Sequence, residues 1–397
     1  MNFSKLPRPH PDAVRFAPFF IGINLIGGVH LPFFPVWLAS VGFDPQTTGL
    51  LMASMGVVRV FTGPVLGVAA DAQGARRFFI IALTLVAAAS YAGYMAFAGT
   101  VFVVLFSLTS SASFSAIGPL LEGITLKTAI VRGFDYGRVR LWGSAAFVAM
   151  NLAGGAIVAA NGISSFLPIL IAAGAVSFAA SLWLPHEDAK PHHIEPAAIG
   201  RDALKLGMQP LFLLFVAAAG IGQACHSFYY AFGTLNWEAL HYDSGLIGFL
   251  WALGVIAEIV LLTFSSRIVA RLGPIRMLLI GTGAGLVRWT ALALSPPLWL
   301  LIPVQCLHAG TFCAVHLGTM HFILRAVPAH LVGTAQSIFA AISIGMFFSI
   351  GQYGSGVLFA AFGSYGYLAM TAMSVLALGL SLLLGRLWDG GVLELRR

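Results

Sequence analysis

Four charged side chains lie within long apolar stretches of this sequence: Arg59, Glu122, Glu258 and Arg288. A fifth, Arg140, lies at or just inside the start of another apolar stretch. Charge in apolar surroundings is costly unless it is paired or reaches water. The first four charges cancel formally. Arg140 adds a positive charge that either binds an anionic molecule or extends to a polar boundary, and the sequence leaves both options open.

Glu122 and Arg140 form the leading candidate for binding a small molecule. They are 18 residues apart, on consecutive apolar stretches joined by a short polar turn. The planar guanidinium of arginine suits a carboxylate or paired hydroxyls. The alternative is a structural ion pair between two helices. Further candidates for the same site are Trp142 as an aromatic platform, with a core tryptophan as the alternative, and Asn24, His226 and Tyr229 as weaker ones.

Glu258, Arg288 and His308 form a second group, on three successive apolar stretches. A carboxylate in such a stretch holds a proton more readily when its basic partner moves away, which makes Glu258 the best candidate for carrying a proton. The alternative is an inert brace between Glu258 and Arg288. Arg59 either lines a cavity as an anion partner or binds helix carbonyls, and His316 and His321 are weaker candidates.

The elements that position these residues follow from composition. The chain has 397 residues, of which 59% are hydrophobic and only 9% are charged, with a mean hydropathy of +0.91. Soluble domains carry about 25% charged residues, so this composition excludes a soluble protein. The cysteines, Cys225, Cys306 and Cys313, all lie in apolar stretches and do not suggest a disulfide framework. The chain is therefore expected to lie in a lipid bilayer.

Twelve apolar stretches are long enough to cross about 30 Å of hydrocarbon as helices. Because they are continuous rather than alternating, they predict helices and not a barrel. They cover about 16–40, 47–70, 78–98, 100–126, 139–160, 163–184, 208–235, 244–265, 277–294, 297–325, 333–361 and 364–388. The predicted organisation is a six-helix bundle at 14–184, a polar linker at 185–207 and a second six-helix bundle at 208–388.

The basic residues predict the orientation. With the N-terminus in the cytoplasm, every lysine and arginine except Arg59 and Arg288 falls in a cytoplasmic loop or tail. Both termini are then cytoplasmic, and the net charge of +7 reflects topology rather than a nucleic-acid partner. The linker histidines, His186, His192 and His193, match no closed metal site.

The two halves are related by a shift of 199 residues. This shift superposes Gly49 on Gly248 and Arg59 on Glu258, as well as Gly74 on Gly273 and Arg77 on Arg276. Parallel halves of six spans are typical of secondary transporters, which bind solute near the membrane midplane where the halves meet.

Several motifs identify a resemblance at this point. The loop from Gly67 to Arg77 (GVAADAQGARR) is similar to the loop between the second and third helices of the major facilitator superfamily. The resemblance implies gating roles for Asp71, Arg76 and Arg77, while plain anchoring at the membrane face is the alternative. Ala72 departs from the pattern, since a basic residue is usual there.

Further segments narrow the resemblance. The stretches 31–38 (LPFFPVWL) and 136–144 (YGRVRLWGS) resemble the family of lactose permease, and 136–144 resembles the phenylpropionate permease family still more closely. Segments 253–258, 285–289 and 307–312 also resemble the phenylpropionate family. Thr311 stands where lactose permease has a carboxylate, so proton carriage would fall to Glu258.

The resemblance implies alternating-access import of an aromatic monocarboxylate, such as 3-phenylpropionate, together with a proton. A sugar or nucleoside symporter and a drug or metabolite exporter are the alternatives. No enzyme or nucleotide-binding motif accompanies these features. We therefore expect a transporter of the bacterial inner membrane that is not an enzyme, works as a monomer and uses no cofactor, with a small solute, a proton and the lipid bilayer as its partners.

Overall fold

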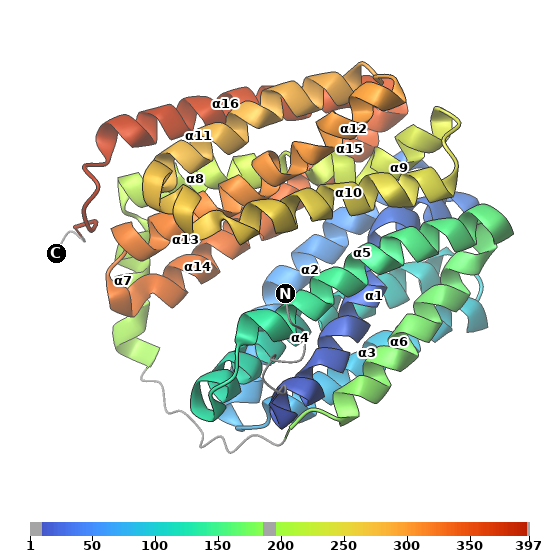
Figure 1. The fold of residues 1–397 in the computed structure, drawn as a ribbon, viewed down its shortest axis with the longest axis horizontal. Helices are drawn as coiled ribbons and strands as arrows, with labels where there is room; N and C mark the ends of the chain where they lie inside the picture. Colours follow the sequence, from blue (N-terminus) through green and yellow to red (C-terminus); the bar gives the residue numbers. More distant parts are fainter. Residues whose placement is uncertain (1–9, 186–195, 395–397) are drawn as a thin grey trace, which may run out of the picture. The chain divides into compact units, whose positions relative to one another are not determined.

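The computed structural model describes residues 10–185 and 196–394, and over these residues it contains helices and no strands. Figure 1 shows their order along the chain. The first helices are α1 (Pro11–Ser40), α2 (Pro45–Ala72), α3 (Arg76–Ala96), α4 (Thr100–Arg132), α5 (Tyr136–Asn161), the 3-10 turn η2 (Ile163–Ser165) and α6 (Phe166–Leu182).

The remaining helices follow the predicted linker, of which residues 186–195 lie outside the described part of the chain. They are α7 (Pro196–Gly207), α8 (Pro210–Ala224), α9 (Ser227–Ala239), α10 (Ser244–Thr263), α11 (Ser265–Ala293), α12 (Leu298–Cys306), η3 (Ala309–Ala314), α13 (Val315–Ala326), η4 (Ala329–Leu331), α14 (Val332–Ala340), η5 (Ala341–Phe347), α15 (Phe348–Phe362), η6 (Gly363–Gly366) and α16 (Tyr367–Leu387). Segments η3 and η5 are π-helical.

The expectation of an all-helical membrane protein is confirmed. Within the described residues, eleven helical stretches are long and apolar enough to cross a membrane. The last of these runs from Ala329 to Leu387 and holds two of the twelve predicted spans. These two spans separate at Gly363, whose φ of 55° ends α15.

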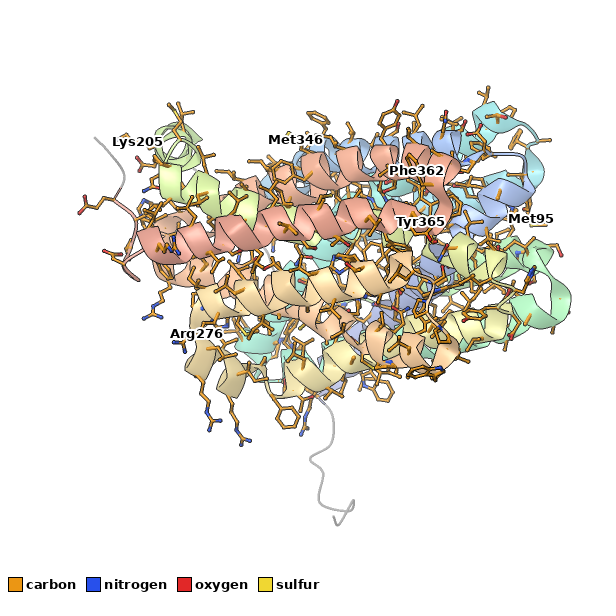
Figure 2. The ribbon with its side chains drawn as sticks, turned by 90° about the horizontal axis from the view of Figure 1, so that it is seen from above. Met95, Lys205, Arg276, Met346, Phe362 and Tyr365 are labelled. Atoms are coloured by element: carbon orange, nitrogen blue, oxygen red, sulfur yellow. The ribbon has the colours of Figure 1, made fainter. Side chains whose placement is uncertain are left out.

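The surface of the protein is apolar over large areas, unlike that of a soluble protein, while some charged and polar side chains are buried. Large apolar side chains such as Phe61, Val101 and Trp299 are between 68% and 76% exposed, whereas Arg288 and His226 are fully buried. Figure 2 shows Met346, Phe362 and Tyr365 on the outside of the helices. Apolar patches on this scale are unfavourable in water and favourable in lipid.

The described residues form two compact units. The first contains residues 10–34 and 61–185, and the second contains 35–60 and 196–394. In the first unit, α3 packs against α4 and α6, and a core cluster includes Phe19, Ile80 and Leu121.

In the second unit, α11 packs against α16 and α13, and α16 also packs against α8 (Figure 1). Its core cluster includes Phe215 and Phe322, whose rings stack with centroids 4.2 Å apart. Helix α7, which the sequence analysis did not predict within the linker, joins this cluster through the buried side chain of Leu206.

Candidate functional site

A chain of hydrogen bonds in the second unit joins the candidates Glu258, His308 and Arg288. Oε1 of Glu258 lies 2.7 Å from Nε2 of His308. The other ring nitrogen of His308, Nδ1, lies 2.7 Å from Nη1 of Arg288. His308 therefore stands between the carboxylate and the guanidinium, which form no direct bridge with each other among the described contacts.

These three residues are withdrawn from solvent. Arg288 is fully buried, and the side chains of His308 and Glu258 are 7% and 16% exposed. A buried charge is tolerated only when it is paired and hydrogen-bonded, and removing one partner of a buried pair typically costs about 3–5 kcal/mol. Breaking this arrangement therefore costs more free energy than breaking a surface ion pair.

The chemistry of the donors assigns the proton positions. Arginine has only N–H donors, so Nδ1 of His308 must accept the hydrogen bond from Arg288. The ring is then neutral, with its proton on Nε2, from which it donates to Oε1 of Glu258. In this arrangement His308 has no site for a second proton unless Arg288 moves away. An added proton can reside only on Oε2 of Glu258.

The hydrogen-bond chain continues through Thr311 to His226. Nη1 of Arg288 also donates to Oγ1 of Thr311, at 2.9 Å. Nε2 of His226 lies 3.1 Å from the same hydroxyl, while its Nδ1 lies 3.0 Å from the carbonyl of Gln223. Since a carbonyl only accepts, Nδ1 of His226 donates to Gln223. The hydroxyl of Thr311 also lies 3.4 Å from the carbonyl of His308, so its single proton serves either that carbonyl or Nε2 of His226.

A second branch leaves Arg288 through Nη2. This atom donates to Oε1 of Gln305 at 3.0 Å, and the amide of Gln305 donates to the hydroxyl of Tyr229 at 3.1 Å. The guanidinium also lies over two rings, 4.6 Å from the centroid of Tyr229 and 4.7 Å from that of Trp289. Both contacts stabilise its charge away from water.

Three buried donors near this cluster have no hydrogen-bond partner among the described residues. They are Nε of Arg288, Nε1 of Trp289 and the hydroxyl of Tyr367. A buried polar group left unpaired costs about 1–3 kcal/mol.

Local backbone structure brings Glu258 to His308. Gly254 and Glu258 lie one turn apart on the same face of α10. A Cβ at Gly254 would lie 3.2 Å from the ring of His308, so the glycine permits this close approach. His308 directly precedes the π-helical segment η3, and π-helical turns are frequent at functional sites.

The first unit holds Glu122 and Arg140 together, on α4 and α5. Nε of Arg140 donates to Oε1 of Glu122 at 3.1 Å, and the two side chains are 54% and 49% exposed. They border a hollow of about 190 Å³ whose wall also includes Phe20, Ile23 and Asn24. The terminal Nη1 and Nη2 of Arg140 have no partner among the described contacts.

The cytoplasmic-loop candidates also form defined contacts. Asp71 pairs with Nε of Arg76 at 2.5 Å, and the N-terminus of α3 has no side-chain cap. Arg77 donates to the carbonyls of Leu184 at 2.8 Å and Leu182 at 2.9 Å, where α6 ends. These contacts tie the start of α3 to the end of α6.

The remaining candidates lie in different surroundings. Trp142 is 59% exposed and does not line the hollow beside Arg140, so it is neither a core tryptophan nor part of that wall. His226 and Tyr229 belong to the Arg288 cluster in the second unit. Arg59, His316 and His321 are exposed.

Sequence reasoning missed Gln305. It is fully buried and connects Arg288 to Tyr229. A signal was present, since Gln305 is a polar residue in an apolar stretch three positions before His308, on the same helical face.

Comparison with known proteins gives one family and several relatives. The model of the MFS_1 like family matches residues 19–368. The chain is 30% identical, over 88% of its length and 90% of the relative, to a probable 3-phenylpropionic acid transporter of Escherichia coli strain K12. It is also 28% identical, over 83% of its length and 84% of the relative, to a maltose permease of Geobacillus stearothermophilus.

A solved structure supports the fold. The nucleoside transporter NupG superposes with a TM-score of 0.81 at 17% identity, covering 96% of this chain and all of that one. This degree of likeness shows a shared fold and carries no information about substrate.

Proposed function

Because the chain belongs to the MFS_1-like family of the major facilitator superfamily, and is thus an inner-membrane transporter and not an enzyme, we propose that it imports an aromatic monocarboxylate with a proton. The proposed substrate class includes 3-phenylpropionate. The observation that carries the proposal is the pairing of a half-exposed arginine in one unit with a buried carboxylate–histidine–arginine chain in the other.

Arg140 is the proposed carboxylate ligand. Its contact with Glu122 uses only Nε, so the terminal edge of the guanidinium is available for two parallel hydrogen bonds to a carboxylate. An exposed pair of this kind contributes about 0–1 kcal/mol, so a substrate displaces Glu122 at little cost. Phe20 and Ile23 on the wall of the hollow provide apolar surface for the ring.

The size of the hollow favours a small solute. Ligand pockets typically enclose about 300–1,000 Å³. The hollow beside Arg140, at about 190 Å³, is smaller than this range. A monocyclic acid fits this part of the site better than a disaccharide does.

Glu258 is the proposed proton carrier, and its contacts with His308 and Arg288 determine where an added proton resides. While Arg288 donates to Nδ1 of His308, the added proton resides on Oε2 of Glu258. Protonation removes the carboxylate charge that balances Arg288 through the imidazole, so the buried guanidinium is then uncompensated. A rearrangement that gives Arg288 another partner is thereby favoured, and this links proton binding to alternating access.

Proton-coupled sugar or nucleoside import is the second candidate function, and export of a drug or metabolite is another. The relatives named above include a maltose permease, and an arginine–glutamate pair also suits paired hydroxyls. We further propose that the chain works as a monomer with both termini in the cytoplasm. In support of this orientation, Figure 2 places Lys205 and Arg276 at one end of the second unit, opposite Phe362 and Tyr365.

A competition experiment in a counterflow assay tests the identity of the substrate. Proteoliposomes loaded with unlabelled 3-phenylpropionate should take up the labelled acid, and external 3-phenylpropionate should block this uptake. Maltose and uridine at the same concentration should not. Block by maltose or uridine, with no effect of the acid, would replace the proposed substrate with a sugar or nucleoside.

A further inference from the structure

A second hollow lies in the second unit, away from the Arg288 cluster. It is an open hollow of about 670 Å³, bordered by α11, α13, α16 and the segment that follows α16. Four arginines line it: Arg271 and Arg276 on α11, Arg325 on α13 and Arg386 on α16. One carboxylate, that of Asp389, shares the wall.

These arginines have no partners in the part of the chain that the structure describes. No hydrogen bond or ion pair engages their guanidinium groups, and all four residues are exposed. Oδ1 of Asp389 accepts a hydrogen bond from the backbone N–H of Gly391 at 2.9 Å, and its carboxylate offsets one of the four positive charges. The hollow therefore concentrates positive charge that the protein itself does not fully neutralise, which a bound anion would relieve.

The backbone adds to this preference. Gly273 has a φ of 71° and a ψ of 172°, which are not helical, so a new helical segment begins at Pro274 within the wall of the hollow. The N-terminus of a helix favours negative charge through its free N–H groups and its dipole. It faces the same space as the four arginines.

Apolar residues continue the hollow in the direction of the membrane. Leu279 lies one turn beyond Arg276 along α11, and Leu382 lies one turn before Arg386 along α16. Leu382 is 48% exposed. At a rise of 1.5 Å per residue, these side chains lie roughly 5 Å further along their helices than the arginines, toward the middle of the apolar helical stretches. An acyl chain below a phosphate would meet this sequence of surfaces, whereas a free anion would not need it.

The last wall is held in place by the residues after α16. Nε1 of Trp388 donates to the carbonyl of Gly391 at 2.8 Å, and the N–H of Leu393 donates to the carbonyl of Ala326 at 2.7 Å. Leu393 is also buried in the core cluster of the second unit. The hollow is thus a formed feature of the fold and not a gap beside a loose tail.

We propose that this hollow, which we call the four-arginine hollow, binds the headgroup of an anionic phospholipid. The phosphodiester lies among Arg271, Arg276, Arg325 and Arg386, and the acyl chains follow Leu279 and Leu382. Basic pockets between transmembrane helices on the cytoplasmic side are suited to such headgroups. The site is separate from the residues that we assign to substrate and proton, so it does not depend on the proposed function.

The test uses the full chain purified in a neutral detergent and titrated with lipid, with bound lipid counted by native mass spectrometry. We expect one phosphatidylglycerol to bind at least tenfold more tightly than phosphatidylethanolamine. Each arginine beside an anionic headgroup is worth roughly fivefold in affinity. The double variant Arg276→Gln/Arg325→Gln should therefore bind phosphatidylglycerol at least tenfold more weakly.

Arg267→Gln is the matched control, because Arg267 is an exposed arginine on the same helix and does not line the hollow. It should change the affinity by less than about twofold. An equal loss in this control, or equal binding of the two lipids by the wild type, would overturn the proposal in favour of general surface charge.

Competition with inorganic phosphate distinguishes a lipid headgroup from a free anion as the ligand of the four-arginine hollow. A hundredfold excess of phosphate should leave phosphatidylglycerol bound, and displacement would show a site for a free anion instead. A measurement on the wild type alone complements the variants, since phosphatidylglycerol should raise the Tm while phosphate should not. A Tm that responds to phosphate and not to the lipid would contradict the proposal.

Discussion

Replacing Arg140 with lysine should weaken substrate binding without unfolding the protein. The terminal edge of its guanidinium offers two N–H donors to a carboxylate, whereas the ammonium of lysine is a single compact charge. The substitution therefore removes one of two charge-assisted hydrogen bonds, each of which contributes about 1.5–3 kcal/mol. Since 1.4 kcal/mol corresponds to tenfold, the half-saturation concentration should rise about ten- to a hundredfold.

Stability should change little in the same variant. The side chains of Arg140 and Glu122 are 54% and 49% exposed, and pairs of this kind contribute about 0–1 kcal/mol. The assay is counterflow of labelled 3-phenylpropionate in proteoliposomes over a range of concentrations, with the Tm as a check of folding.

Arg138→Lys is the matched control. Arg138 lies in the first turn of the same helix, is 68% exposed and contacts Asp135 at 3.7 Å. Its half-saturation concentration should stay within about twofold of the wild type. A wild-type value for Arg140→Lys, or an equal change in Arg138→Lys, would refute the assignment of Arg140 as the carboxylate ligand.

Three further predictions concern the second unit and the loop after α2. Glu258→Gln should abolish accumulation of substrate against a gradient and preserve counterflow. The control Glu238→Gln on α9 should keep both activities. Accumulation by Glu258→Gln would show that another residue carries the proton. Arg288→Met should lower the free energy of unfolding by about 3–5 kcal/mol in a denaturant titration. The double variant Arg288→Met/Glu258→Leu should regain at least half of that loss, because replacing both buried charges is nearly neutral. No regain of stability would show that the two charges are not coupled. Arg77→Gln should lower stability by about 1 kcal/mol through loss of its bonds to the carbonyls of Leu182 and Leu184, and an unchanged denaturation midpoint would show that these bonds do not contribute.

Hydropathy predicted the helices of this protein well because a bilayer imposes length and apolarity on each span. Helix α7 was missed for the same reason, since it is a 12-residue helix outside the membrane-spanning stretches. Among the described side chains of α7, Leu206 reaches the core, and the charged residues Arg201, Asp202 and Lys205 gave the segment the composition of a linker.

Three candidate residues that the sequence placed together are in contact in the structure. Residue types and the family resemblance placed Glu258, Arg288 and His308 together, but a direct brace between Glu258 and Arg288 remained an open alternative. In the structure, His308 lies between them. Helical periodicity shows which residues share a face of a helix. It does not show which side chains on three neighbouring helices are in direct contact. The π-helical segment η3 also shifts the register after His308, which sequence periodicity does not reveal.

The central claim is that proton movement drives accumulation of an aromatic acid. The most direct measurement is uptake of radiolabelled 3-phenylpropionate into proteoliposomes, with and without an inwardly directed proton gradient. The account predicts accumulation above the external concentration that collapses when a protonophore is added. Folded protein that takes up no acid, or accumulation that the protonophore leaves unchanged, would contradict it.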